Sequence, residues 1–294
     1  MDQKKDQKNI FESQLPQRIE KSKLQQSSMT RELISGSFEI VGDIAIIKVP
    51  SSLAEQQSVL STKIMATHRN VRTVLNQTNP VFGEYRLRRL DWVVGERKSH
   101  TLHKEHGCLF RVDLSEVYFS PRLAFERMRV AKLVKDGEVI VNMFAGVGCF
   151  SIIIAKYSKA SRIYSIDINP RAISLMEENI RLNKLEDRVT TMMGDAKEVL
   201  EKQFPDPVDR ILMPLPSKAF EYLDAACLIL KPRGFIHYYD FIHTRDREHI
   251  PQKVVEKVNK KLVHLNRRYE VGSSRSVRTV GPNWYQVVLD LQVE

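Results

Sequence analysis

Two glycines interrupt an apolar stretch in "VNMFAGVGCFSI", residues 141 to 152, and this segment constrains the fold more than any other. The apolar run before the turn predicts a buried strand, and the run after it, "CFSIIIAKYS", predicts a helix. Glycine adopts dihedral angles and allows close backbone approaches that other residues do not. Because ligands of doubly wound sheets bind at the carboxyl ends of the strands, we predict that Gly146 and Gly148 make room for a ligand.

Strands and helices alternate on both sides of this turn. A helix is expected at 122–134, and the apolar runs that follow predict a mostly parallel sheet with helices on both faces. Strands are expected at 138–144, 162–168, 189–195, 208–216 and 234–242, helices at 149–158, 170–184, 219–230 and 247–262, and a closing hairpin at 264–277 and 284–293.

Two acidic residues end successive strands after the glycine turn. Asp167 ends "IYSID" and can accept hydrogen bonds from both hydroxyls of a ribose. Asp195 follows the third strand, where an adenine ring would lie. This set resembles the class I S-adenosylmethionine-dependent methyltransferases, with a Rossmann-like α/β sheet. The alternatives are that both acids cap helices, or that the ligand is NAD, although no diphosphate-binding fingerprint is present.

The rest of the chain divides by composition. Residues 1–34 are polar and are expected to form a flexible tail, with a basic arm for RNA as the alternative. Residues 35–115 contain strand patterns, a Gly42-Asp43 turn signal and one helical stretch, and predict a small α+β domain that contacts RNA. Residues 116–294 form the larger sheet domain.

Charge and cysteine content indicate the kind of partner and compartment. Lys and Arg total 46 against 36 for Asp and Glu, so the net charge of +10 favours a polyanionic partner such as nucleic acid. The three cysteines form no CxxC pair, which indicates a reducing compartment, and we expect a cytoplasmic protein. No run is long enough for a membrane span. We expect a monomer, because no clear apolar helix face is left over.

The fourth strand ends in "ILMPLPSKAF", where enzymes that methylate exocyclic amines often carry an Asn or Asp before the prolines. Pro214 offers no side-chain acceptor, so a proton acceptor is sought elsewhere. Glu126 on the preceding helix is a candidate general base for a ring nitrogen. Arg86 and Arg88 are candidates to stabilise charge on the base. The alternative for Glu126 is a surface ion pair with Arg129 or Arg122.

Several segments together resemble the archaeal and eukaryotic tRNA (guanine-N1) methyltransferase family, which modifies guanine 37, the nucleotide 3′ of the anticodon. They are "SFEIVGDIAIIKVP", "GEYRLRRLDWVVGE", "HGCLFRVDLSEVYFSPRLAFERMRV", "NMFAGVGCFSI", "SIDINPRAI" and "GFIHYYDF", within residues 37–294. The resemblance implies methyl transfer from S-adenosylmethionine to N1 of guanine 37 in tRNA. It also implies that Glu126 is the general base and that Arg86, or Arg88, contacts the guanine. Implied cofactor contacts are Arg122, Phe144, Asp167, Asn169 and Asp195, beside the two turn glycines.

The sequence departs from the family pattern at three places. Family members usually carry an additional N-terminal domain that contacts the tRNA elbow, whereas a polar segment precedes Ser37 here. The fourth-strand motif is usually Asn-Leu-Pro or Asn-Pro-Pro, so Pro214 and Pro216 are expected to contact the substrate base through the main chain. Asn142 stands where an acid is frequent before the glycine turn.

Other assignments remain open at this point. Rival activities on the same fold are a methyltransferase or an aminocarboxypropyl transferase acting on a wybutosine precursor at the same nucleotide, and a non-catalytic RNA-binding homologue. His100, His103 and His106 are spaced by three in a strand-like segment, which does not place them on one face, so no metal site is expected. The segment "RSVRTVGPNWY" would either clasp RNA or pack as a strand.

Overall fold

The computed structural model describes residues 38–204, 206–246 and 249–294. Residues Glu39–Glu294 form one compact unit. The predicted flexible tail at 1–34 lies outside the described residues.

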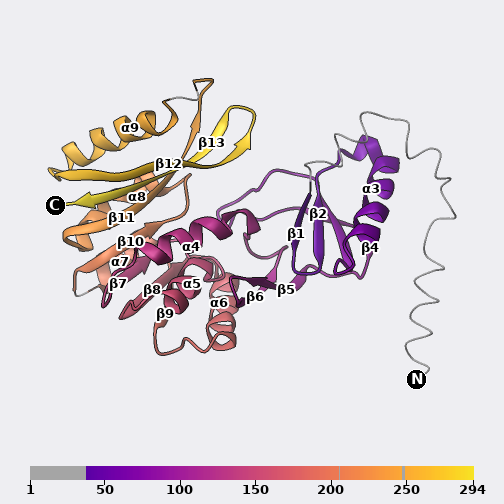
Figure 1. Cartoon of the computed structure of the whole chain (residues 1–294), viewed down its shortest axis with the longest axis horizontal. Helices are drawn as coiled ribbons and strands as arrows, with labels where there is room; N and C mark the ends of the chain where they lie inside the picture. The colour runs from indigo at the N-terminus through magenta and orange to yellow at the C-terminus, as the bar shows by residue number, and fades with distance from the viewer. Residues whose placement is uncertain (1–37, 205, 247–248) are drawn as a thin grey trace. The chain divides into compact units, whose positions relative to one another are not determined.

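A seven-stranded sheet dominates this unit (Figure 1). Its strands are β7 (Val139–Asn142), β8 (Arg162–Asp167), β9 (Val189–Met193), β10 (Val208–Met213), β11 (Leu230–His243), β12 (Tyr269–Gly281) and β13 (Trp284–Val293). The spatial order is β12-β13-β11-β10-β7-β8-β9. Strands β11, β10, β7, β8 and β9 pair in parallel, and β13 and β12 add an antiparallel edge. The chain order reverses between β7 and β10, so the topological switch point lies there.

Helices cover both faces of this sheet. They are α4 (Ala124–Leu133), α5 (Cys149–Tyr157) and α6 (Pro170–Leu182) on one face, and α7 (Ala196–Gln203), α8 (Ala219–Ile229) and α9 (Ile250–His264) on the other. Neighbouring strand residues take opposite sides: Ile140 packs with the first helix group and Val141 with the second. The period of two along each strand therefore supplies two separate cores. The predicted α/β fold is confirmed.

The smaller sheet has the order β1-β2-β3-β4. Its elements are β1 (Phe38–Val41), β2 (Ile44–Ile47), the 3-10 turn η2 (Ser51–Leu53), α3 (Ala54–Thr67), β3 (Thr73–Gln77) and β4 (Leu90–Gly95). The Gly42-Asp43 turn joins β1 to β2, as predicted, and Gly42 has a φ of +57°. Strands β2 and β3 are parallel, with α3 as their crossover.

A separate two-stranded hairpin, β5 (His100–Glu105) and β6 (Cys108–Asp113), follows the small sheet. The side chains of Asn179 on α6 and of Asn183, which caps the end of α6, bond to the backbone of Arg111 and Leu109 respectively. Buried Phe110 and Val112 belong to the core that includes α5 and α6. By these contacts the hairpin belongs with the large sheet, so the domain boundary at residue 115 stays a prediction.

Candidate cofactor and base site

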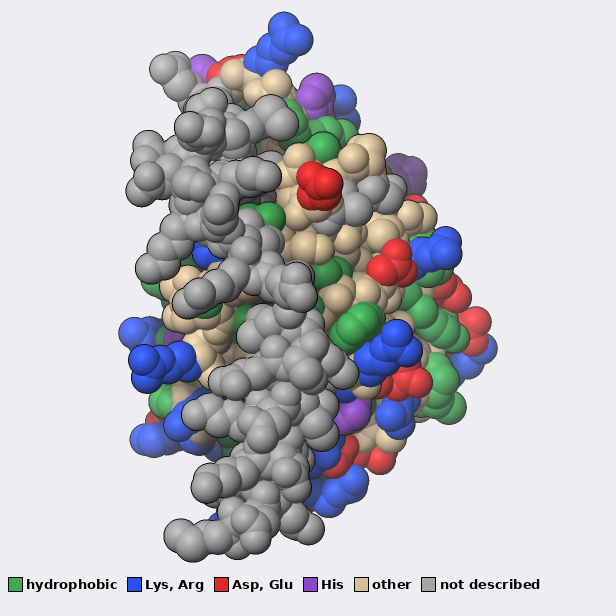
Figure 2. Space-filling model, turned by 90° about the vertical axis from the view of Figure 1, so that its right-hand side faces the viewer, with side chains coloured by type: hydrophobic (Ala, Val, Ile, Leu, Met, Phe, Trp, Pro, Cys, Tyr) green, Lys and Arg blue, Asp and Glu red, His purple; other side chains and the backbone are tan. Residues whose placement is uncertain are grey.

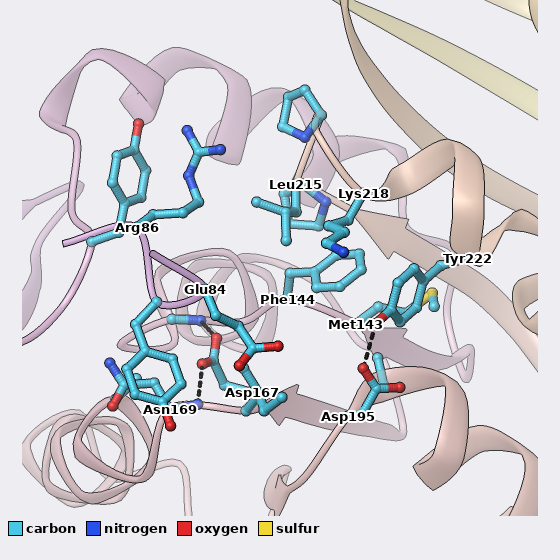
Figure 3. Close-up of a pocket in the computed structure, with 18 of the residues that line it drawn as sticks. Glu84, Arg86, Met143, Phe144, Asp167, Asn169, Asp195, Leu215, Lys218 and Tyr222 are labelled. Carbon is cyan, nitrogen blue, oxygen red and sulfur yellow. Dashed lines mark hydrogen bonds between the residues drawn. The ribbon is translucent and has the colours of Figure 1, made fainter. Parts of the chain in front are cut away.

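A cavity opens at the carboxyl ends of β7, β8, β9 and β10 (Figure 3). Phe144 follows β7, Asp167 ends β8, Asp195 follows β9 and Pro214 follows β10. The loop between β3 and β4 contributes Arg86 to the same cavity. Residues from five segments that are distant in sequence therefore meet at the switch point, where sheets of this topology bind ligands.

The glycine turn after β7 has two functions. Gly146 has a φ of +56°, lines the cavity, and donates its N–H to Asp167 Oδ2 at 2.7 Å. Gly148 has a φ of +88° but does not line the cavity, and a Cβ there would lie 2.8 Å from Met176 Cγ. Gly146 therefore opens the site, whereas Gly148 allows α5 and α6 to pack closely. Of the two glycines predicted to make room for a ligand, only Gly146 lines the cavity, and its contact with a ligand stays a prediction.

Asp167 is held by main-chain donors. Its two carboxylate oxygens accept from Gly146 N and from Asn169 N, the latter at 3.0 Å. Burial raises the pKa of Asp167 above its usual value, and the backbone hydrogen bonds offset only part of this increase. Asn169, which also lines the cavity, caps α6 by accepting from Arg171 N. Asp167 itself caps no helix, so its remaining acceptor capacity faces the cavity.

Asp195 serves two purposes. It is the N-cap of α7, accepting from Lys197 N at 2.9 Å, and the Tyr222 hydroxyl donates to its other oxygen (Figure 3). Tyr222 packs edge-to-face on Phe144 with the ring centroids 5.3 Å apart. The capping alternative is therefore correct for Asp195, yet the same side chain lines the cavity next to two aromatic rings.

Arg86 borders the cavity near Leu215 (Figure 3). It donates to Ser217 Oγ at 3.1 Å, and its guanidinium carbon lies 5.0 Å from the centre of the Tyr118 ring. Arg86 has a φ of +55°, an uncommon conformation for an arginine, which turns its side chain toward the β10 loop.

Sequence reasoning missed several residues of this cavity. Tyr118 lines it, and Arg278 on β12 donates to the Tyr118 hydroxyl at 3.3 Å and to Ser120 Oγ at 3.0 Å. Burial raises the pKa of Tyr118, but the charges of Arg278 and Arg86 lower it to a net value below the ordinary one. Further unpredicted lining residues are Glu84, Tyr85, Lys218, Tyr222 and Gln286. The basic-aromatic pattern around Arg278 was the one available signal.

Besides Gly148, three predicted site residues do not line the cavity: Arg122, Arg88 and Glu126. Arg122 is half-exposed and pairs with Glu39 at 3.0 Å. Arg88 is buried, where it donates to Glu39 and to the carbonyl of Phe119 at 2.7 Å. Of the two candidate arginines only Arg86 lines the cavity, together with the predicted Pro214 and Pro216.

Glu126 is buried beside the site, with a side-chain exposure of 1%, and does not line the cavity. Arg129 donates to both of its oxygens, at 3.0 and 2.8 Å, and the Tyr239 hydroxyl donates to Oε1 at 2.7 Å. Arg275 donates to Oε2 at 2.5 Å. The predicted alternative, an ion pair with Arg129, is therefore present, although it is buried and does not include Arg122.

The cluster extends behind Arg129. Asp290 accepts from Arg129 and from His237 Nδ1, and His237 Nε2 contacts Arg210 at 2.8 Å. Because arginine has only donors, His237 Nε2 accepts and Nδ1 carries the proton. Burial lowers the pKa of His237 below 6.5, so this imidazole is neutral at pH 7. Arg129 is thereby paired with two carboxylates, those of Asp290 and Glu126.

The pKa of Glu126 reflects these partners. Burial alone would raise it, but hydrogen bonds from Arg129 and Tyr239 and the charges of Arg129 and Arg275 lower it to a net value below the ordinary 4.5. In this arrangement Glu126 is an ionised but weakly basic carboxylate. A general base for a ring N–H needs a freer oxygen and a higher pKa.

A comparison with protein-family models decides the family. The description "TRM5/TYW2 methyltransferase domain" matches residues 101–271, which is more than half of the 294 residues, and "TYW2 N-terminal domain" matches 21–98. The chain belongs to the TRM5/TYW2 methyltransferase family. The expected family and enzyme class are thereby confirmed.

Relatives within the TRM5/TYW2 family carry three kinds of name. A tRNA (guanine(37)-N(1))-methyltransferase Trm5b of Pyrococcus abyssi is 40% identical and aligns over 90% of this chain and 76% of its own length. A tRNA 4-demethylwyosine(37)-methyltransferase Taw21 of Saccharolobus solfataricus is 37% identical, over 87% and 93%. A tRNA(Phe) (4-demethylwyosine(37)-C(7)) aminocarboxypropyltransferase of Methanocaldococcus jannaschii is 32% identical, over 87% and 98%.

Solved TRM5/TYW2 structures share the fold. A complex of aTrm5 with tRNALeu has a TM-score of 0.79 at 34% identity, covering 93% of this chain and 76% of the other. TYW2 of M. jannaschii in complex with AdoMet has a TM-score of 0.65 at 26% identity, covering 88% and 99%. The predicted class I methyltransferase sheet is thereby confirmed. Within the described part of this family member, no helix has both the length and the apolar character to cross a bilayer.

Proposed function

We propose that this protein transfers a methyl group from S-adenosylmethionine to N1 of guanine 37 in tRNA. The observation that carries the proposal is that Arg86 lines the same cavity as Asp167 and Asp195. A cation suited to a guanine oxygen thus borders the cavity that holds two carboxylates suited to a nucleoside cofactor. The Trm5b relative, at 40% identity, supports the same reaction.

The cavity residues fit an adenosine-containing cofactor. Asp167 keeps acceptor capacity toward the cavity and would bind the ribose hydroxyls. Asp195, Phe144 and Ile168 would surround the adenine with one acceptor and apolar surface. When bound, S-adenosylmethionine supplies an electrophilic methyl group on a sulfonium. The AdoMet complex of M. jannaschii TYW2 supports this cofactor.

The protein must also remove a proton. Guanine N1 carries a proton at neutral pH, so its lone pair becomes available for bond formation as that proton leaves. Glu126 would take the N1 proton, and Arg86 would stabilise the negative charge that develops on O6. Pro214 and Pro216 line the same cavity and would contact the base. The guanine must leave the anticodon stack to reach this depth.

The tRNA would contact the small sheet and the β5–β6 hairpin. A polar groove there is lined by Lys98, His100, His103, Lys104 and Arg111, with Asp43 also present. Figure 2 shows lysine and arginine side chains along the lower and left margins of one face, and further ones at the top and on the right, where acidic side chains are interspersed. Backbone phosphates of the anticodon stem would follow such basic side chains, while the cavity selects the base. We further propose that the protein acts as a monomer.

A second candidate is methylation of 4-demethylwyosine at the same nucleotide. The Taw21 relative, which aligns over 93% of its own length at 37% identity, favours it. An aminocarboxypropyl transfer would leave Glu126 without a proton to accept at N1, so we rank it below both methylations.

Nucleoside analysis separates these functions. Unmodified tRNA transcript carrying guanine 37 would be incubated with protein and S-adenosylmethionine labelled in the methyl group, and in parallel with cofactor labelled in the aminocarboxypropyl carbons. The proposal expects methyl label in 1-methylguanosine at position 37. Methyl label found only when the transcript carries 4-demethylwyosine supports the second candidate, and aminocarboxypropyl label or no label overturns both.

A further inference from the structure

Three donors hold Glu126, and they differ in accessibility. Arg129 on α4 and Tyr239 on β11 are buried or nearly so, with exposures of 16% for the Arg129 side chain and 0% for Tyr239. Arg275 stands on β12, the outermost strand of the sheet, and its side chain is 31% exposed. Only Arg275 can therefore leave Glu126 without disturbing the core.

The surroundings of Arg275 suit a nucleic acid. Its guanidinium lies 5.2 Å from the ring centre of Phe125, which is 69% exposed. A cation beside an exposed aromatic ring provides both phosphate binding and a stacking surface. In addition, Arg275 Nε is buried without a hydrogen-bond partner, so the observed position satisfies this arginine incompletely.

We propose that Arg275 is a positioning residue that holds Glu126 in its ion-pair cluster in the free enzyme and moves to an RNA phosphate when tRNA binds. This inference rests on the proposed function. Release of Arg275 leaves Oε2 with one donor, Arg129 Nε at 3.0 Å, so this oxygen gains a free lone pair that would take the guanine N1 proton. Arg129, anchored by Asp290, and Tyr239 stay and keep the carboxylate in place.

The charged groups around Glu126 determine how the departure of Arg275 changes the pKa of Glu126. Arg129 faces it from α4, Tyr239 from β11 and Arg275 from β12, while Asp290 on β13 and neutral His237 stand behind Arg129. Loss of one of two adjacent cations raises the pKa of a carboxylate by about one unit or more. Glu126 would thus become a stronger base when the substrate arrives.

The first test measures binding without turnover. The slope of log affinity for tRNA against log salt concentration counts the phosphates neutralised. Arg275→Gln should lower this slope by about one relative to wild type, and Arg275→Lys should retain it. An unchanged slope in Arg275→Gln overturns the proposal, whatever nucleoside analysis shows for the proposed function.

The second test compares pH profiles of single-turnover methylation. Rates at subsaturating enzyme report groups of the free enzyme, and rates at saturating enzyme report groups of the complex. In wild type the acidic midpoint should be about one pH unit lower in the subsaturating profile. Arg275→Gln should raise that midpoint to match the saturating one, and Arg275→Lys should restore the difference.

A matched control is Arg268→Gln, which removes an exposed charge just before β12 and should move neither midpoint. Coincident midpoints in wild type contradict the proposal, as does an equal increase of both midpoints in Arg275→Gln, because Arg275 would then remain on Glu126 in the complex.

Discussion

Asp167 and Glu126 are two buried or half-buried carboxylates near one cavity, and they are held in opposite ways. Asp167 accepts from backbone N–H groups and carries no adjacent cation, so burial dominates and raises its pKa. Glu126 accepts from two arginines and a tyrosine, which lower its pKa. Under the proposed function, Asp167 would be a fixed acceptor for the ribose hydroxyls. Glu126, in contrast, is a paired carboxylate that would have to lose one of its cations before it could act as the proposed base.

The largest effect is expected from a substitution of Glu126, the carboxylate of this pair that is proposed to act as the base. Glu126→Gln keeps the shape but removes the proton acceptor, so single-turnover methylation at pH 7 should fall by about 10²- to 10⁴-fold. Cofactor affinity, measured by calorimetry without RNA, should stay within about twofold because Glu126 does not line the cavity. Unaltered turnover in this variant excludes Glu126 as the base.

Removal of Asp167 should have the complementary effect. Asp167→Ala deletes the proposed acceptor for the ribose hydroxyls. Hydrogen bonds to charged groups contribute about 1.5–3 kcal/mol, so cofactor affinity should fall roughly 10- to 100-fold. The same calorimetric titration measures it. If cofactor binds the variant as tightly as wild type, Asp167 does not contact it.

Substitutions of Gly146 and Gly148 distinguish a glycine that lines the cavity from one that allows two helices to pack. Gly148→Ala places a Cβ against Met176 at a positive φ and should destabilise the protein by about 2–3 kcal/mol. In Gly146→Ala the Cβ makes only an ordinary van der Waals contact, 3.8 Å from the Tyr118 carbonyl oxygen, so the change adds backbone strain alone, about 1–2 kcal/mol. Urea unfolding of both variants provides the measurement, and equal losses would argue against a special packing role for Gly148.

The smallest expected effect is the pH dependence of cofactor binding. A carboxylate must be ionised to accept from two hydroxyls, and the pKa of Asp167 is raised above 3.8. Affinity should therefore be full well above that raised pKa and decline as pH falls through it, at a higher pH than for an ordinary aspartate. Calorimetric titrations between pH 4 and 7 of wild type against Asp167→Ala would show it, because the variant should lack this decline.

The sequence predicted much of the fold because local pattern and long-range packing agree there. The strands from β7 to β11 and their helices are apolar runs of the right length between turn signals, and all of them are present. The eight-residue helix α7 was not predicted. Its signals were Asp195 as a cap and Glu198 three residues later, but two helical turns owe most of their stability to packing, here of Val199 and Leu200.

The site was less predictable, because its decisive contacts join distant segments. Asp167 and Asp195 follow from strand ends, which meet at one edge of any parallel sheet, whereas Phe144 was implied by the family resemblance. Whether Arg86 or Arg88 faces the cavity depends on a positive φ at Arg86 that no pattern indicates. For Glu126, the sequence indicated only the i,i+3 partner Arg129. The other members of its cluster, Tyr239, Arg275 and Asp290, come from strands more than 100 residues away.

A crystal structure of the protein with guanine 37 tRNA and S-adenosylhomocysteine tests the central claim most directly. The account predicts an extruded guanine with its N1 within about 2.6–3.2 Å of a Glu126 oxygen, and Arg275 on a phosphate. A Glu126 carboxylate still enclosed by Arg129, Tyr239 and Arg275, with the guanine out of its reach, would contradict it.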